Sequence, residues 1–157
     1  MRVLVVDDEE KIRNVIKEYA EFEGYEIDEA CDGMEAIAKC KDNNYDIIIM
    51  DIMMPKLDGF SSIKEIRKTK NIPVIMLSAR SEEYDKLFGF EIGIDDYVVK
   101  PFSPKELMAR INAVINRSKS AAGQSVLQDK YVLEGLDILG IKKNNSKQFE
   151  TFKEYME

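Results

Sequence analysis

Four short hydrophobic runs, each followed by a polar residue, constrain the fold of this chain more than any other feature. Runs that are rich in β-branched residues and lack polar alternation are typical of strands buried on both faces of a parallel sheet. The carboxyl ends of parallel strands form one edge, where ligand crevices lie, so these polar residues should converge there. The runs and the residues that follow them are 3–6 with Asp7 and Asp8, 47–50 with Asp51, 74–77 with Ser78, and 97–99 with Lys100.

The composition restricts the classes of protein that fit. With 157 residues, 45% of them hydrophobic and 34% charged, the chain can form one full domain and a small appendage. No apolar stretch approaches the ~20 residues of a membrane span, and the N-terminus lacks a signal-peptide pattern, so we expect a cytoplasmic protein. The absence of histidine excludes a Ser-His-Asp hydrolase and argues against zinc. Cys31 and Cys40 are expected to be small hydrophobes on or near one helix.

The negative charge lies in the first part of the chain. The net charge is −7, and the six lysines and six acidic residues of 119–157 cancel, so the whole excess falls in residues 1–118. An acidic domain repels phosphates, so we expect no DNA contact before residue 118.

Helical patterns separate the runs, and a further short strand is predicted at Glu26–Ala30. Asp32 and Ser103 are expected to cap the second and fifth helices, and Asp58–Gly59 to begin the third. The alternation of five strands and five helices predicts an α/β fold with a doubly wound parallel sheet, followed by a short C-terminal extension. The helices are expected within residues 12–22, 33–40, 59–66, 82–92 and 104–115.

The converging polar groups favour phosphoryl chemistry. Three carboxylates in one pocket repel each other, and Mg²⁺, which prefers oxygen ligands, would resolve that repulsion. Mg²⁺ together with Lys100 is suited to stabilising a transferring phosphoryl group. Asp51 stands alone at the end of a central strand and is the expected acceptor, since a carboxylate can form an aspartyl phosphate. The alternative is structural, because aspartates after strands often cap helices and a lysine there is usually solvated.

Residues 1–118 resemble the receiver domain of bacterial two-component response regulators, through Val5–Glu9, Asp51–Pro55 with Asp58–Gly59, Ile75–Ala79 and Tyr97–Phe102. The resemblance implies a flavodoxin- or CheY-like sheet in the order 2-1-3-4-5. It implies that Asp51 accepts a phosphoryl group from a histidine kinase and that Lys100 pairs with the phosphate. The Mg²⁺ ligands that it implies are Asp7, Asp8, Asp51 and the backbone carbonyl of Met53.

The same resemblance implies a switch. Ser78 would donate a hydrogen bond to a phosphoryl oxygen, and Tyr97 would turn inward as that hydroxyl moves. Ordinary strand packing with a solvated hydroxyl is the alternative for Tyr97. The Lys100–Pro101 peptide bond is expected to be cis.

Residues 94–97, with Lys105–Leu107 and Arg110, resemble the dimer face of the OmpR/PhoB subfamily. This face consists of the fourth helix, fifth strand and fifth helix, and would form a homodimer on phosphorylation. A solvated charged face is the alternative, since exposed ion pairs contribute little. The residues implied to form intersubunit ion pairs are Lys86, Asp95, Asp96, Glu106, Arg110 and Arg117.

The end of the chain predicts an incomplete effector. Small polar residues suggest a linker at 119–127, and residues 128–157 resemble the N-terminal part of a winged-helix DNA-binding domain. The helix that would enter the major groove is absent, so DNA binding is expected only in a full-length form.

Three functions remain open. The first is a phosphoacceptor that catalyses only its own phosphorylation and dephosphorylation and controls transcription in the full-length protein. The second is a stand-alone receiver that acts through protein contacts. The third is a Mg²⁺-dependent phosphohydrolase with an aspartyl nucleophile. Met53 argues against the third, because such enzymes carry a second aspartate two residues after the nucleophile.

Overall fold

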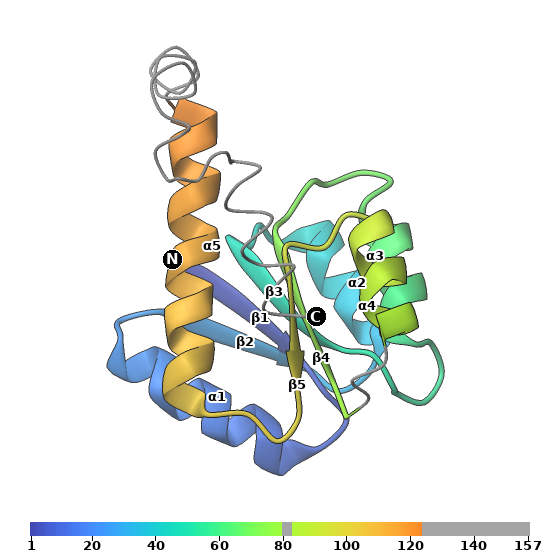
Figure 1. Ribbon diagram of the computed structural model, residues 1–157, viewed down its shortest axis with the longest axis horizontal. Helices are drawn as coiled ribbons and strands as arrows, with labels where there is room; N and C mark the ends of the chain where they lie inside the picture. Colours follow the sequence, from blue (N-terminus) through green and yellow to red (C-terminus); the bar gives the residue numbers. More distant parts are fainter. Residues whose placement is uncertain (80–82, 124–157) are drawn as a thin grey trace. The chain divides into compact units, whose positions relative to one another are not determined.

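The computed structural model, which describes residues 1–79 and 83–123, contains a five-stranded sheet (Figure 1). The strands lie in the order β2-β1-β3-β4-β5, and all neighbouring pairs are parallel. The predicted strand order is therefore confirmed. The strands are β1 (Arg2–Val6), β2 (Glu26–Ala30), β3 (Ile47–Asp51), β4 (Val74–Ser78) and β5 (Asp96–Val99).

A helix follows each strand, and polar side chains cap three of the helices as the sequence leads one to expect. The Asp32 carboxylate accepts a 2.8 Å hydrogen bond from the backbone N–H of Glu35. Asp58 and Ser103 cap the third and fifth helices in the same way. The helices are α1 (Glu10–Phe22), α2 (Gly33–Asp42), α3 (Gly59–Ile66), α4 (Glu83–Glu91) and α5 (Pro104–Gly123).

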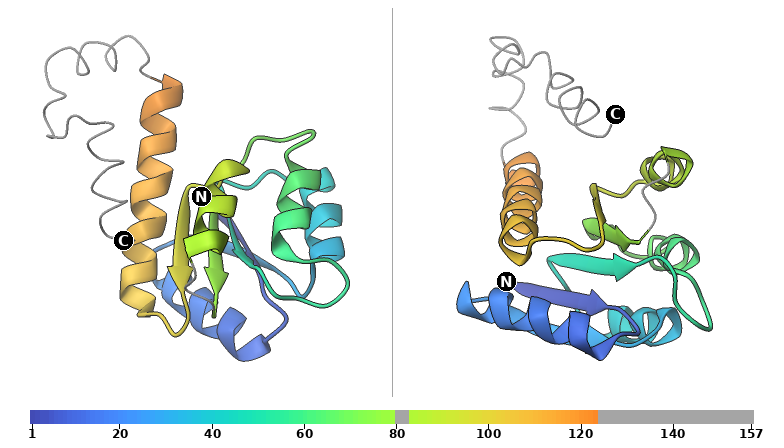
Figure 2. Two further views of the ribbon diagram at one scale, coloured as in Figure 1. Left: turned by 45° about the vertical axis from the view of Figure 1, so that its right-hand side comes forward. Right: turned by 60° about the horizontal axis from the view of Figure 1, so that its bottom comes forward.

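Each face of the sheet buries its own apolar core. Successive side chains of a strand point to opposite faces, so Leu4 and Val6 contribute to one core and Val3 and Val5 to the other. Helices α2, α3 and α4 lie over the first face, and α1 and the part of α5 before residue 116 lie over the second (Figures 1 and 2). The sheet is thus covered on both sides, as its unbroken hydrophobic strands require.

The two cysteines differ in environment. Cys40 is buried in the first core, as predicted for a small hydrophobe. Cys31 is exposed, so its predicted apolar role is wrong. Cys31 follows the last residue of β2 and precedes the capping residue of α2, which places it at the rim of the sheet.

Helix α5 continues through residues 119–123, the first part of the predicted linker. The two alanines of this stretch are good helix formers, and the helix ends at Gly123. Residues 124–157, with the rest of that linker and the effector segment, lie outside the described residues. No described helix is both long enough and apolar enough to cross a membrane.

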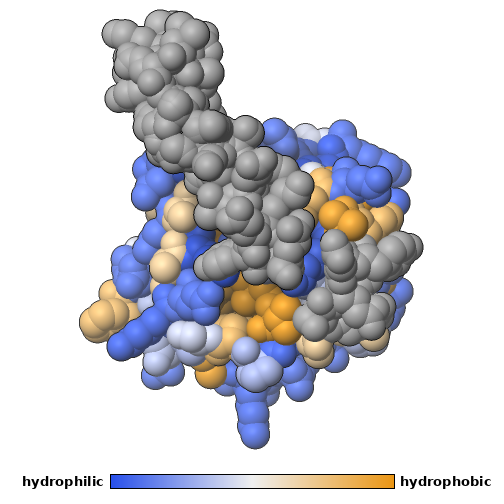
Figure 3. Space-filling model, viewed as in Figure 1, coloured by the Kyte–Doolittle hydropathy of each residue, from blue (hydrophilic) through white to orange (hydrophobic). Residues whose placement is uncertain are grey.

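Hydrophilic residues occupy much of the face in Figure 3, and the apolar residues visible there form small areas among them. This agrees with the high charge content of the chain. Phe22 at the end of α1 and Leu87 on α4 are the most exposed large apolar side chains of the described residues, with 90% and 60% of their surface accessible.

Candidate functional site

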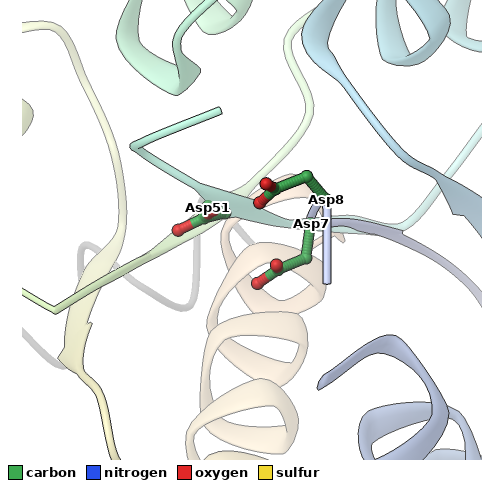
Figure 4. Close-up of side chains that lie close together, drawn as sticks. All are labelled: Asp7, Asp8 and Asp51. Atoms are coloured by element: carbon green, nitrogen blue, oxygen red, sulfur yellow. The ribbon is translucent and has the colours of Figure 1, made fainter. Parts of the chain in front are cut away.

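The neighbouring strands β1 and β3 bring three carboxylates together. Val6 pairs with Met50 in the sheet register, so the next residues of the chain, Asp7 after β1 and Asp51 at the end of β3, come to the same edge. Asp8 follows at once, and the three side chains extend to the same side of the strand ends (Figure 4). One carboxylate oxygen from each residue lies within 4.8 Å of the corresponding oxygens of the other two. The predicted convergence of Asp7, Asp8 and Asp51 is confirmed.

The three carboxylates differ in their exposure to water. Asp7 is fully buried, Asp51 is 3% exposed, and Asp8 is exposed at the rim. One oxygen of Asp7 accepts a 2.9 Å hydrogen bond from the backbone N–H of Glu9. Two of the three acidic groups are therefore withdrawn from solvent, and the third is accessible to it.

Lys100 supplies positive charge to this cluster. Its Nζ atom lies 2.9 Å from Asp7 Oδ2 and 3.2 Å from Asp51 Oδ1. Glu9, which the sequence analysis did not assign to the site, lies 3.8 Å from the same ammonium. The Lys100–Pro101 peptide bond is cis, as predicted. The lysine thus bridges the carboxylates of β1 and β3 from the end of β5.

The charge of the cluster is incompletely balanced. Burial raises the pKa of Asp51 to about 6, and the neighbouring Asp7 carboxylate adds to the shift, although Lys100 acts in the opposite direction. Burial tends to lower the pKa of Lys100, but its contacts with Asp7 and Asp51 outweigh that effect and raise it. Three acidic groups with one close ammonium form a site that a divalent cation would complete.

The donor set fits magnesium. All three side chains offer carboxylate oxygens, the ligands that a hard cation prefers, and the exposed Asp8 leaves the site open to water. Met53, whose backbone carbonyl is the further predicted ligand, lies two residues after Asp51 in the β3–α3 loop. The part of Met53 in ion binding stays a prediction.

Ser78 is the last residue of β4 and is fully buried. Because β4 lies between β3 and β5, its carboxyl end lies between those of the strands that lead to Asp51 and Lys100. The backbone N–H of Lys100 donates a 2.7 Å hydrogen bond to the carbonyl of Ser78. All four polar strand ends predicted from the sequence therefore lie along one edge.

The sequence of residues 3–112 matches the family described as the response regulator receiver domain. The chain belongs to this family. The family assignment favours the signalling interpretation of the acidic edge over the phosphohydrolase alternative.

Similar proteins include named transcriptional regulators. The chain is 49% identical to the transcriptional regulatory protein ResD of Bacillus subtilis over 121 residues, which are 77% of this chain and 50% of ResD. It is 42% identical to the alkaline phosphatase synthesis transcriptional regulatory protein PhoP of the same species, over 96% of this chain and 63% of PhoP. The chain thus spans about half to two thirds of these relatives. Their similarity supports the predicted OmpR/PhoB subfamily.

Solved structures show the same fold. A receiver domain of the Francisella response regulator 1452 is 46% identical, with a TM-score of 0.71 over 74% of this chain and 98% of that one. The response regulator TrrA of Thermotoga maritima, solved in complex with Mg²⁺ and BeF, is 42% identical, with a TM-score of 0.65 over 72% of this chain and 97% of TrrA.

Tyr97 of this receiver domain is turned into the protein. Its side chain is only 4% exposed and belongs to the core that contains Met76 of β4 and Ile94. This burial fits both alternatives weighed from the sequence, a switch in which Tyr97 turns inward and ordinary strand packing. Its predicted part in a switch stays a prediction.

Several residues of the predicted dimer face form ion pairs within the chain. Arg110 Nη1 contacts both carboxylate oxygens of Asp96 at 3.0 and 2.9 Å, and Nη2 contacts Glu106 at 3.1 Å. Asp95 accepts a 2.9 Å hydrogen bond from the backbone N–H of Val74. The remaining two predicted residues are Lys86 on α4, which is half-buried, and Arg117 on α5, which is exposed.

Gly59 is a supporting residue to which sequence reasoning assigned no part in the site. A Cβ atom at this position would lie 2.3 Å from the backbone carbonyl of Asp51 and 3.0 Å from Cα of Ile52. The start of α3 therefore packs directly on the end of β3. The Asp58–Gly59 pair was a visible signal, but the close contact depends on how α3 packs against the end of β3.

Proposed function

We propose that this receiver domain accepts a phosphoryl group on Asp51. The observation that carries the proposal is the placement of a buried carboxylate, that of Asp51, beside Lys100 and close to two further aspartates at the edge of the sheet. In the proposed step, an oxygen of Asp51 bonds to phosphorus while the bond to the donor breaks and its electron pair leaves with the donor. A histidine kinase, whose phosphohistidine nitrogen is a good leaving group, is the proposed donor.

The residues around Asp51 suit this step. Asp7, Asp8, Asp51 and the carbonyl of Met53 would hold Mg²⁺, which when bound would neutralise charge on the phosphoryl oxygens. Lys100 is already held 3.2 Å from Asp51 and would pair with the phosphoryl group without large movement. The similar response regulator TrrA, solved in complex with Mg²⁺ and BeF, supports this arrangement.

The proposed output is a change at the face formed by α4, β5 and α5. Ser78 ends β4 at the site, and Tyr97 lies on the adjacent strand with its ring in the core. A hydrogen bond from Ser78 to the phosphoryl group would pull on the segment after β4, and the buried Tyr97 would stabilise the shifted state. The dimer would form through Lys86, Asp95, Asp96, Glu106, Arg110 and Arg117.

Control of transcription is proposed for the longer protein. ResD and PhoP are named as transcriptional regulators, and the similarity to PhoP extends over 152 residues, beyond the receiver family match. Residues 128–157 would begin the DNA-binding domain and 119–127 would join it to the receiver. The acidic receiver itself would not contact DNA.

Acetyl phosphate with Mg²⁺ provides the central test. Intact mass spectrometry should detect the addition of one phosphoryl group to the unsubstituted chain and none to Asp51→Ala. EDTA should abolish the adduct. Asp46→Ala, which removes another aspartate near the opposite edge of the sheet, is the control and should be labelled normally. An adduct that persists in Asp51→Ala would move the acceptor elsewhere and refute the proposal.

A further inference from the structure

Arg13 on α1 lies behind the metal-binding edge and touches its backbone. Its Nη1 atom donates a 2.8 Å hydrogen bond to the backbone carbonyl of Asp7. That carbonyl belongs to the peptide group that joins Asp7 to Asp8. A donor held at this oxygen therefore limits rotation of the one peptide unit that links the two proposed metal ligands.

A second contact fixes the arginine itself. Arg13 Nε donates a 2.9 Å hydrogen bond to Glu29 Oε1 on β2, and only 16% of the Arg13 side chain is exposed. Lys17 lies 3.5 Å from the other oxygen of Glu29. The backbone carbonyl of Glu29 accepts a 2.6 Å hydrogen bond from Lys39 of α2. The glutamate is thus anchored from both neighbouring helices and holds the guanidinium in one orientation.

Asp8 is the ligand that most needs such support. Asp7 is held by Lys100 and by the N–H of Glu9, and Asp51 is held by Lys100. Among the described residues, none donates a hydrogen bond to the exposed Asp8 carboxylate. Its position is therefore determined chiefly by the backbone that Arg13 holds.

We propose that Arg13, fixed by Glu29, is a positioning residue for Mg²⁺ binding, acting through the Asp7–Asp8 peptide group. This inference rests on the proposed magnesium site. Arg13 would not contact the ion directly, since its guanidinium is engaged with the Asp7 carbonyl and Glu29. Loss of such support around a metal site typically weakens binding by about tenfold or more.

The sign of the effect distinguishes positioning from simple electrostatics. Removing a positive charge beside an acidic cluster makes the cluster more negative, so electrostatics alone would strengthen Mg²⁺ binding in Arg13→Gln. Loss of positioning predicts weaker binding. The two explanations therefore predict opposite changes of the Mg²⁺ dissociation constant.

Isothermal titration of the full 157-residue chain with Mg²⁺ tests the inference. Arg13→Gln should raise the dissociation constant on the order of tenfold, and Arg13→Lys, which keeps the charge, should give an intermediate value. The matched control is Arg2→Gln. Arg2 begins β1 at the opposite end and pairs with Asp28 of β2 at 2.8 Å, so its removal deletes the same charge from the same strand pair. This control should change the constant by less than about twofold.

The rate of labelling by acetyl phosphate gives a second measurement. At low Mg²⁺ the Arg13→Gln chain should be labelled about tenfold more slowly, and saturating Mg²⁺ should restore most of the rate. Because Mg²⁺ also stabilises a folded state that binds it, circular dichroism must show that the Arg13→Gln chain is folded at low Mg²⁺. Unchanged or tighter Mg²⁺ binding in a folded Arg13→Gln chain would overturn the inference. An equal loss in Arg2→Gln would overturn it as well.

A failure of Arg13→Gln to fold and a failure of the chain to bind Mg²⁺ must be distinguished. If Arg13→Gln does not fold, Arg13→Lys decides, and an unchanged dissociation constant in that variant would refute the positioning role. The proposed magnesium site fails, and the inference with it, if the unsubstituted chain does not bind Mg²⁺. The same conclusion follows if the Asp51→Asn variant binds Mg²⁺ as tightly as the unsubstituted chain. Normal binding by the unsubstituted chain together with normal binding by Arg13→Gln refutes the inference alone.

Discussion

Lys100 and Asp7, 93 positions apart in the sequence, are joined by a 2.9 Å hydrogen bond between ammonium and carboxylate. The same ammonium lies 3.2 Å from Asp51, so one side chain connects the ends of β1, β3 and β5. Asp7 is fully buried and Asp51 nearly so. The stability of this edge and its proposed chemistry therefore depend on the same lysine.

Replacement of Lys100 by methionine should lower both the stability of the chain and its rate of phosphorylation. Without the ammonium, two buried carboxylates lose their counter-ion, and we expect the free energy of unfolding in EDTA to fall by about 3 kcal/mol. Mg²⁺ should recover part of the loss. Labelling by acetyl phosphate should slow by at least about tenfold. Urea titrations with and without Mg²⁺ measure the first effect. Lys105→Met, at an exposed lysine of α5, should match the unsubstituted chain, and equal stability of the two variants would contradict the expectation.

The pKa of Asp51 predicts a dependence of stability on pH. Its value of about 6 in the folded chain lies above the ~3.9 of an unfolded aspartate. The contribution of this group to stability is therefore fully present below pH ~4 and is lost as the pH rises through about 6. Without Mg²⁺, Asp51→Asn should raise the free energy of unfolding at pH 7.5 by roughly 2–3 kcal/mol and change it little at pH 4.

Thermal or urea unfolding at both pH values measures this difference. Asp42→Asn, at an exposed aspartate that ends α2, is the control and should gain less than about 1 kcal/mol at neutral pH, the effect of removing a negative charge from a helix C-terminus. Mg²⁺ should narrow the difference between Asp51→Asn and the unsubstituted chain, because it favours the ionised carboxylate. A variant that is less stable than the unsubstituted chain at pH 7.5 would count against the assigned cause.

The close contact between Gly59 and Asp51 predicts that an added methyl group is costly. In Gly59→Ala the new Cβ would meet backbone atoms, which cannot move aside as a flexible side chain does. We expect a loss of about 1–3 kcal/mol or more in the free energy of unfolding. Gly89→Ala is a suitable comparison, because its Cβ would meet the terminal methyl group of Ile94, and alanine is favoured within a helix. Similar losses in both variants would contradict the structural argument.

The proposed dimer face predicts a selective effect of charge reversal. With Mg²⁺ and beryllofluoride as a phosphoryl substitute, the chain should dimerise, and sedimentation velocity measures its dimer dissociation constant. Glu106→Lys places a cation next to Arg110 and should weaken dimerisation on the order of tenfold. Glu65→Lys, at an exposed residue of α3, should have little effect. Undiminished dimerisation of Glu106→Lys would remove this residue from the interface.

The local pattern was sufficient for much of the fold. The hydrophobic runs predicted the strands, and Asp32, Asp58 and Ser103 marked helix starts, because each signal depends only on neighbouring residues. The strand order came from the family resemblance. The sequence did not show that α5 continues through residues 119–123, since small polar residues suit both a linker and a helix end.

Part of the candidate site could also be predicted from the sequence, and part could not. The sequence by itself placed Asp7, Asp8 and Asp51 at one edge, because parallel strands must end on the same side of the sheet. Only the tertiary structure decided that Lys100 reaches both buried carboxylates.

The supporting contacts of the site belong wholly to the tertiary structure. Arg13 holds the Asp7 carbonyl, Tyr97 lies in the core, and Arg110 pairs with Asp96 within one chain. These contacts join side chains from elements distant in the sequence. Side-chain reach and burial select their partners once the helices have packed, and no spacing of residue types along the chain specifies that choice.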